Sequence, residues 1–161
     1  MTDPARKPDS DIVREAPIPL EKCGGAKALD VLTDRWTWLI VREALYGVSR
    51  FDDMRSDLDI PRSVLTSRLK KLVEDGVLET RQYKDPGARA RTAYFLTEKG
   101  QALAPVFMAL MQWGDTHLRG GRKSLALRDS RTGLDVRSAL VPLGAEVVPF
   151  NALKLTVVPD A

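Results

Sequence analysis

The sequence is poor in the side chains that metal sites and covalent catalysis use most. Its 161 residues include one cysteine, Cys23, and one histidine, His117. A single cysteine cannot form an internal disulfide bond, and these two residues do not make the cluster of soft ligands that zinc needs. We therefore expect neither a disulfide framework nor a bound metal.

Sequence motifs of enzymes and of cofactor-binding loops are also missing. Gly24-Gly25 and Gly120-Gly121 do not form the spaced glycine fingerprint of a dinucleotide site, and the sequence has no P-loop. Cys23 and His117 lie too far apart in sequence to indicate a nucleophile with its base. We expect a protein that is not an enzyme and that has no cofactor.

Long apolar segments are missing as well. No run approaches the roughly 20 apolar residues that span a bilayer, and the first 20 residues lack the apolar centre of a signal peptide. Residues 1–22 mix charges with four prolines and cannot bury enough apolar surface to fold. We expect a cytoplasmic protein, away from membranes, whose residues 1–22 form a flexible arm.

Positive charge is present, and it is concentrated in one segment. The formal net charge is +3 and the isoelectric point is near 9.1. Residues 62–91 contain eight basic and four acidic side chains, so this segment alone carries a net charge of +4. Such a basic segment favours contact with nucleic acid.

The pattern of residues 51–76 is typical of a helix-turn-helix. Phe51, Met54 and Leu58 repeat at helical spacing before residues 59–61 break the pattern. A leucine stripe then resumes on a second helix, residues 62–75, which we expect to enter the DNA major groove. The polar residues away from that stripe are the candidate DNA contacts: Arg62, Ser63, Thr66, Ser67 and Lys70.

The start of the first of these two helices offers another candidate phosphate contact. Ser49 followed by Asp52 resembles a capping box, with Asp in place of Glu. Ser49 and Arg50 would then lie at a helix N-terminus, where free N–H groups and the helix dipole favour an anion. A capped and solvated helix end explains the same residues equally well.

A hairpin with a basic tip follows. Residues 77–83 and 92–96 favour strands, and Asp85-Pro86-Gly87 is typical of a turn. We expect Lys84, Arg89 and Arg91, in the wing at 84–91, to reach phosphates or the minor groove. The alternative is a solvated turn, but a basic hairpin directly after a helix-turn-helix favours the DNA role.

Helices are also expected on both sides of this motif. Residues 25–32 predict a short helix, and Asp34 is a good N-cap for a longer one that ends near Tyr46-Gly47. Thr97 can cap a final helix, residues 101–118, in which Pro105 should introduce a kink or begin a second segment. Apolar residues cover more than one face of this helix. We therefore expect it to form a homodimer, or else to be covered by the C-terminal tail of its own chain.

The tail after Gly120-Gly121 predicts a small β unit, residues 122–161. Residues 125–128 and 134–140 have strand patterns around a turn at 129–133. Two further apolar runs, at 147–150 and 153–158, fit the same unit. We expect it to be an appendage to the main domain, residues 23–118.

Four short motifs together resemble the HxlR family of winged-helix transcriptional regulators. They are Asp-Arg-Trp at 34–36, Leu-Thr-Ser-Arg-Leu at 65–69, Glu-Asp-Gly at 74–76 and Leu-Thr-Glu-Lys-Gly at 96–100. The similarity extends from Cys23 to His117. It implies an α+β, mainly α, winged helix-turn-helix regulator that binds double-stranded DNA as a dimer through its terminal helices, with a small β extension here.

The sequence departs from this family at two positions. Pro61 replaces the serine that usually precedes the recognition helix, which removes a side-chain cap. Cys23 matches the position of the redox-sensing cysteine of some relatives, but it is followed by Gly24 instead of proline. The resemblance therefore leaves open whether Cys23 is a redox sensor or has no redox role.

Control by a small ligand is a further expectation. Six side chains could line an apolar pocket between the first helices and the last one: Trp36, Trp38, Tyr46, Phe107, Met111 and Trp113. The same residues at helical spacing are more often part of a core. The alternative to DNA binding as a whole is a winged-helix adaptor that docks a protein partner.

Overall fold

The computed structural model describes residues 18–87 and 89–158, so residues 1–17 of the predicted arm lie outside the described part. Contacts divide the chain into two compact units, residues 1–33 and 34–161. The first contains a short 3-10 turn, Leu20–Lys22, and helix α1, Gly24–Val31. The predicted helix at 25–32 is thus confirmed to within one residue.

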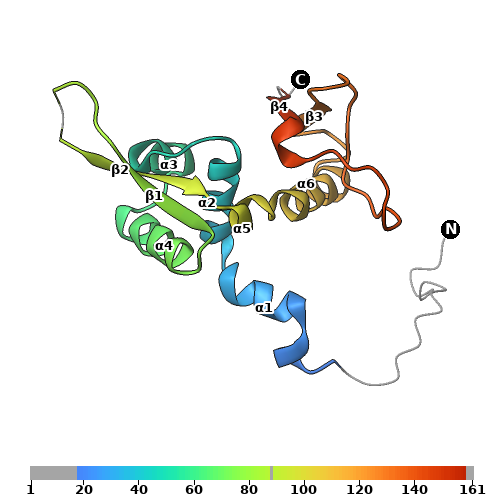
Figure 1. Cartoon of the computed structure of the whole chain (residues 1–161), viewed down its shortest axis with the longest axis horizontal. Coiled ribbons are helices and arrows are strands. Elements are labelled where there is room, and N and C mark those ends of the chain that lie inside the picture. Colours follow the sequence, from blue (N-terminus) through green and yellow to red (C-terminus); the bar gives the residue numbers. More distant parts are fainter. Residues whose placement is uncertain (1–17, 88, 159–161) are drawn as a thin grey trace. The chain divides into compact units, whose positions relative to one another are not determined.

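The second unit begins with three helices and a hairpin (Figure 1). These elements are α2 (Arg35–Leu45), α3 (Phe51–Leu58), α4 (Arg62–Glu74), β1 (Leu78–Tyr83) and β2 (Arg91–Leu96). The two strands are antiparallel, with Leu78 opposite Leu96 and Tyr83 opposite Arg91. The hairpin extends away from the helices as a wing, and the mainly helical winged helix-turn-helix fold is confirmed.

Residues 34–103 form the winged-helix head. Its core is made by one face of each element. Its most buried side chains are Ile40 and Val41 of α2, Met54 of α3, Leu65, Leu69 and Leu72 of α4, and Val77 and Leu78 at the start of the wing. All are at most 2% exposed. Burial of each such side chain contributes about 1.5–3 kcal/mol relative to leaving it in water. The predicted leucine stripe is therefore the anchor of α4.

Asp34 connects α2 to α4. Its Oδ1 accepts hydrogen bonds from the backbone N–H groups of Trp36 (2.9 Å) and Thr37 (3.3 Å), which confirms the predicted N-cap. Its Oδ2 accepts from the Thr37 hydroxyl (2.9 Å) and lies 2.8 Å from Nε of Arg68 on α4. The Asp-Arg-Trp motif thus begins one helix and holds the next.

The end of α4, the wing and helix α5 (Glu98–Gln101) meet at Gly100. The Thr97 hydroxyl accepts from Gly100 N–H (3.1 Å) and donates to the Gly76 carbonyl (2.7 Å). Gly100 is buried, and a Cβ added there would lie 2.2 Å from the Val77 carbonyl oxygen. Glycine is therefore required at this position by close approach of the two backbones.

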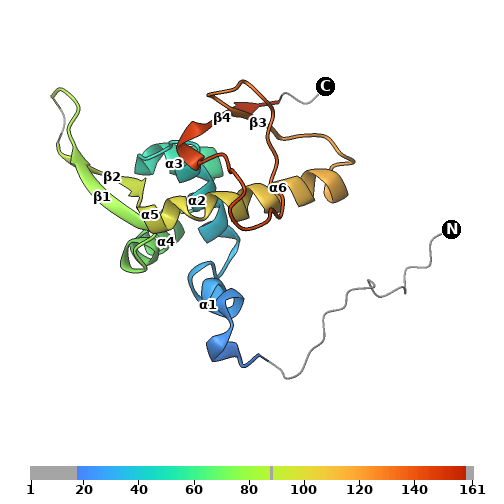
Figure 2. The ribbon, with the colours of Figure 1, turned by 45° about the vertical axis from the view of Figure 1, so that its right-hand side comes forward.

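The predicted terminal helix is divided into two helices, as expected if Pro105 begins a second segment (Figure 2). α5 ends at Gln101, and α6 (Ala104–Leu118) begins with Pro105 in its first turn, as expected for a residue without a backbone N–H. Ala104, Phe107 and Met108 are buried. Four apolar side chains of α6 are about half exposed or more: Val106, Leu110, Trp113 and Leu118.

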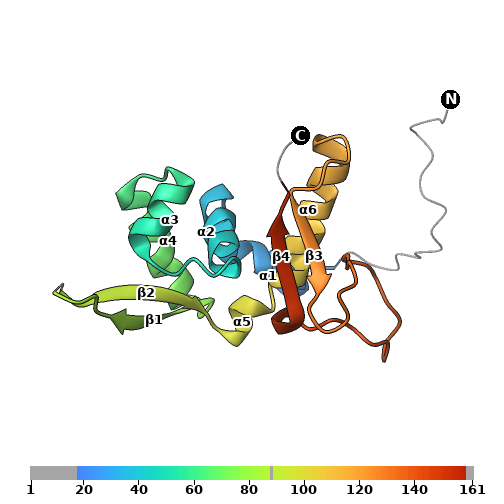
Figure 3. The same ribbon diagram turned by 90° about the horizontal axis from the view of Figure 1, so that it is seen from above.

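The C-terminal extension is a two-stranded antiparallel sheet (Figure 3). Strand β3 (Leu125–Asp129) pairs with β4 (Leu153–Val157), with Leu127 opposite Leu155. The predicted strand at 134–140 is wrong, since this segment contributes only a bridge from Asp135 to Arg128. Beyond this bridge the segment leaves the sheet, because the backbone N–H of Ser138 donates to the Gln112 side chain of α6 (3.2 Å).

Exposed large apolar side chains are concentrated outside the head. Of the fourteen among the described residues, only Tyr46 lies within residues 34–103. Most of the others lie on α6 or in residues 134–158. The head therefore closes its own core, whereas the remainder of the described chain does not.

We predict a pH dependence for the extension. Asp129 is 3% exposed, and the Arg131 side chain, the Arg131 N–H and smaller effects hold its pKa below the ordinary value. A depressed folded-state pKa adds stability above the unfolded-state pKa, and that stability is lost as the pH falls below about 4. Asp129→Asn should therefore lower the unfolding temperature at pH 7, with the difference from wild type shrinking toward pH 3. Asp135→Asn, in an exposed pair, should have little effect at either pH.

Candidate nucleic-acid interface

Helix α4 separates its apolar and polar residues onto two faces. Leu65, Leu69 and Leu72 are at most 1% exposed. The five predicted contact residues of this helix are all exposed: Arg62, Ser63, Thr66, Ser67 and Lys70. The structure thus brings them together on one outward surface, which we call the α4 face.

Side chains on the α4 face interact with their own neighbourhood. The Thr66 hydroxyl donates to the Arg62 carbonyl (2.8 Å), and the Arg62 guanidinium lies over the Phe51 ring, 5.4 Å from its centre. Lys70 Nζ lies 3.6 Å from a Glu74 carboxylate oxygen. Exposed contacts of this kind are weak and exchange readily with an incoming polar ligand.

The capping box predicted at Ser49 is wrong. Arg50 occupies the N-cap position of α3, and the Ser49 carbonyl accepts from the Tyr94 N–H (2.8 Å). Arg50 itself forms a backbone bridge with Ala93. Because this segment pairs with β2 as an extended chain, Ser49 lies one residue too early to cap the helix. Both residues nevertheless remain beside the wing.

The wing carries the remaining predicted contacts. Lys84, Arg89 and Arg91 are exposed on the β1–β2 loop or at the start of β2. Arg50 lies over the Tyr83 ring, 4.6 Å from its centre, and its guanidinium is 3.2 Å from Asp85. Sequence periodicity could not predict this link between the start of α3 and the wing, because Arg50 and Asp85 are 35 positions apart.

The predicted aromatic pocket is partly a packing contact. Tyr46 meets Phe107 edge to face with centroids 6.2 Å apart, and its hydroxyl lies 3.5 Å from the Met111 sulfur. Burial raises the pKa of Tyr46, with the largest opposing effect from Arg42. Trp36 and Trp38 are half-buried. Trp113 is 54% exposed, and its ring contacts the His117 ring.

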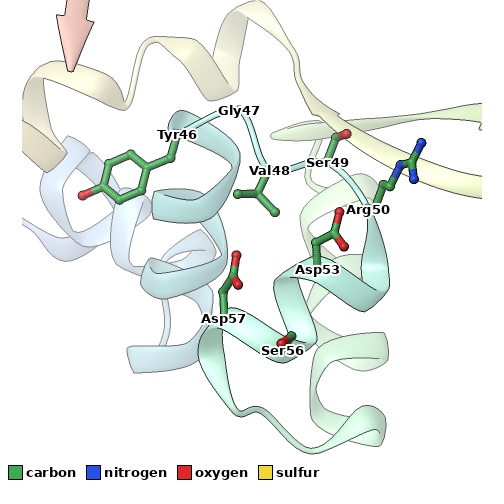
Figure 4. A pocket seen from close by; sticks show the side chains of 8 residues that line it. All are labelled: Tyr46, Gly47, Val48, Ser49, Arg50, Asp53, Ser56 and Asp57. Carbon is green, nitrogen blue, oxygen red and sulfur yellow. The ribbon is translucent and has the colours of Figure 1, made fainter. Parts of the chain in front are cut away.

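An open depression of about 490 Å³ lies beside Tyr46 (Figure 4). Its lining is mostly polar: Tyr46, Gly47, Val48, Ser49, Arg50, Asp53, Ser56 and Asp57. Only Tyr46 belongs to the six predicted pocket residues. This depression therefore does not match the apolar pocket expected from the sequence, and ligand binding by those six residues stays a prediction.

Other candidate sites are simple to place. Cys23 is half-buried at the N-cap position of α1. Among residues 18–87 and 89–158, no three His, Cys, Asp or Glu side chains lie together as a metal site would require. None of the helices in that part of the chain is both long and apolar enough to cross a membrane.

Comparison with known proteins places the same residues in a family context. The model of the HxlR-like helix-turn-helix family matches residues 31–121. Rv3095 of Mycobacterium tuberculosis, an uncharacterised HTH-type transcriptional regulator, is 46% identical over 129 residues, which cover 78% of this chain and 80% of that protein. The HTH-type transcriptional regulator YodB of Bacillus subtilis is 32% identical over 95 residues, covering 58% and 83%.

Solved structures of transcription factors have a fold similar to that of this chain. PA1607, a candidate transcription factor, matches with a TM-score of 0.65 and 33% identity, covering 76% of this chain and 84% of that one. The reduced form of YodB from B. subtilis matches with a TM-score of 0.52 and 29% identity, covering 62% and 98%.

Proposed function

Because this chain belongs to the HxlR-like helix-turn-helix family, we propose that it is a homodimeric, cytoplasmic transcriptional regulator that reads a pseudo-palindromic operator. The observation that carries the proposal is the α4 face beside the basic wing. Five exposed polar side chains project from a helix whose opposite side is anchored by leucines. Hydroxyl and ammonium groups in this arrangement suit base edges and phosphates in the major groove.

The start of α4 supports phosphate binding. Pro61 occupies its N-cap position, and within the described chain no side chain caps the helix. The first N–H groups of α4 therefore have the geometry and dipole that favour a phosphate oxygen. Arg62 and Ser63 lie at this end, and the wing residues Lys84, Arg89 and Arg91 supply further positive charge.

The exposed face of α6 supports a dimer. Val106, Leu110 and Trp113 follow helical spacing and are 48–54% exposed, although Phe107 and Met108 on the same helix are buried. Contact with a second copy would remove this apolar surface from water. A twofold axis would then place two α4 helices about 34 Å apart, or a multiple of one DNA turn.

We also propose that an effector or an oxidant controls the regulator. The end of α2 contacts α6 through Tyr46, which touches Phe107 and Met111. A ligand or an oxidant acting at this contact would shift α6, the proposed dimer helix. Cys23 is the candidate redox sensor, and one structural neighbour with 27% identity is the redox regulator HypR in its oxidised form. Cys23 itself lies before the family match.

A double variant, Lys70→Ala with Arg89→Ala, tests the DNA contacts. We expect at least a tenfold loss of affinity for the DNA upstream of the protein's own gene. The plot of log affinity against log salt should also become shallower by about 0.9 for each phosphate that the variant no longer neutralises, because fewer counterions are released. Gel-shift titrations at several salt concentrations measure both quantities.

The matched control removes the same charge from the extension. Lys123→Ala with Arg137→Ala alters two exposed cations outside the head and should leave affinity and salt slope nearly unchanged. Equal effects of the two double variants would contradict the proposed contacts. A dimer, shown by sedimentation, that binds neither operator nor random DNA would instead favour the protein-docking adaptor.

A further inference from the structure

Two acidic side chains lie within the predicted DNA-binding surface. Asp52 is in the first turn of α3, and Asp85 is on the wing loop. Asp52 Oδ2 lies 3.3 Å from Arg91 Nη1, and Asp85 Oδ1 lies 3.2 Å from Arg50 Nη2. Each acid is thus paired with an arginine on the other element, so the two ion pairs cross between α3 and the wing in opposite directions.

These ion pairs are not needed to hold the wing in place. Backbone contacts already join the base of the wing to the start of α3, through the bridge of Arg50 with Ala93 and the Tyr94 N–H to Ser49 carbonyl bond. The paired side chains are 44–62% exposed. Ion pairs in such solvated positions contribute little to folding stability.

The same pairs reduce attraction to DNA. A carboxylate occupies the positions around a guanidinium that phosphate oxygens take in a complex, and it repels the phosphate itself. DNA can engage Arg50 and Arg91 fully only after each has exchanged its carboxylate for a phosphate. Each pair also subtracts one positive charge from a surface whose affinity depends on counterion release.

We propose that Asp52 and Asp85 act as internal substitutes for DNA phosphates and set how strongly this protein binds DNA of any sequence. They hold Arg91 and Arg50 in the free protein and weaken phosphate-driven binding, so that base contacts from the α4 face make up a larger share of the total. This inference rests on the proposed DNA-binding function. It assigns a role to the two acids within the basic surface.

The test compares the unmodified full-length chain with Asp52→Asn and Asp85→Asn on a random-sequence duplex and on the upstream duplex. Each variant should bind the random duplex several-fold more tightly at low salt. The magnitude of its salt slope should rise by about 0.9 for each arginine released in each subunit. The unfolding temperature should stay close to that of the unmodified chain, since exposed pairs add little stability.

Double-mutant cycles separate the pairs from general charge effects. In an Arg91→Gln background, Asp52→Asn should lose most of its effect on affinity, and Arg50→Gln should do the same for Asp85→Asn. Asp53→Asn is the matched control, because Asp53 lies in the same first turn of α3, whereas within the described part of the chain Arg91 pairs with Asp52 and not with Asp53. Its effect should be the same with or without Arg91→Gln.

Several outcomes would overturn the inference. The increase in DNA affinity caused by Asp52→Asn could persist without Arg91, or it could equal the increase caused by Asp53→Asn. Either result would mean that Asp52 acts only by general charge repulsion. Weaker binding by the Asn variants would mean that the pairs orient the wing for DNA. If the unmodified chain bound neither duplex at low salt, the proposed function would fail and this inference with it, whereas binding without coupling would reject only the inference.

Discussion

Replacing Gly100 by alanine is expected to lower the free energy of unfolding by about 3 kcal/mol, an overpacking effect at the upper end of the usual range. The added Cβ would meet the Val77 carbonyl oxygen at 2.2 Å and a Leu96 methyl at 2.8 Å. The carbonyl cannot move freely, because it precedes β1 and accepts the Thr97 N–H. The clash must therefore separate α5 from the wing.

Thermal unfolding checks this expectation. For a chain of 161 residues, a loss of about 3 kcal/mol corresponds to a decrease in Tm of roughly 6–12 °C. Gly114→Ala is the matched control, since Gly114 is also helical and a Cβ there would meet nothing within 4 Å. That control should be neutral or slightly stabilising, because alanine favours the helix more than glycine does. Similar losses in both variants would show that close approach is not the cause.

Asp34→Ala is expected to cost about 2 kcal/mol of unfolding free energy. About half of this is the N-cap of α2, and the remainder is the interaction with the half-buried Arg68 guanidinium on α4. Asp34→Ser separates the two contributions, since serine can still cap the helix but cannot pair with arginine. The serine variant should lose about half as much unfolding free energy as the alanine variant.

Chemical denaturation of these variants, alone and with Arg68→Ala, measures the coupling. Asp34→Ala should lower the unfolding free energy by less when Arg68 is already absent, because the ion pair with Arg68 is then already lost. Fully additive losses would show that the 2.8 Å ion pair contributes nothing. Because Arg68 is on α4, the proposed recognition helix, the alanine variant should also weaken DNA binding more than the serine variant.

The winged-helix head was predictable because its signals are local. Helical spacing of apolar residues located α2, α3 and α4, and the cap at Asp34 needed only residues two and three positions away. The motif Leu-Thr-Glu-Lys-Gly resembled a family signature, but its physical meaning required the fold. Thr97 and Gly100 are fixed by the backbone of Gly76 and Val77, which lie about twenty positions earlier.

Features that depend on distant pairing were missed. The expected helix does begin at Phe51, but Arg50 is its N-cap, because the carbonyl of Ser49 accepts a hydrogen bond from Tyr94, 45 positions later. The segment 134–140 has a strand pattern, but its backbone at Ser138 bonds to the Gln112 side chain of α6, 26 positions earlier. Local alternation cannot reveal such a distant partner. The pairs of Asp52 and Asp85 were missed for the same reason.

In the proposed dimer, the apolar side chains left exposed on α6 would link the protein's stability to its abundance. A surface that is covered only by a second copy adds to the free energy of folding through mass action, so dilution weakens the fold as well as the assembly. The head, with its closed core, would be much less sensitive. When synthesis of such a regulator falls, its dimer would dissociate before its head unfolds. Operator occupancy would then change by a larger factor than the concentration of the protein.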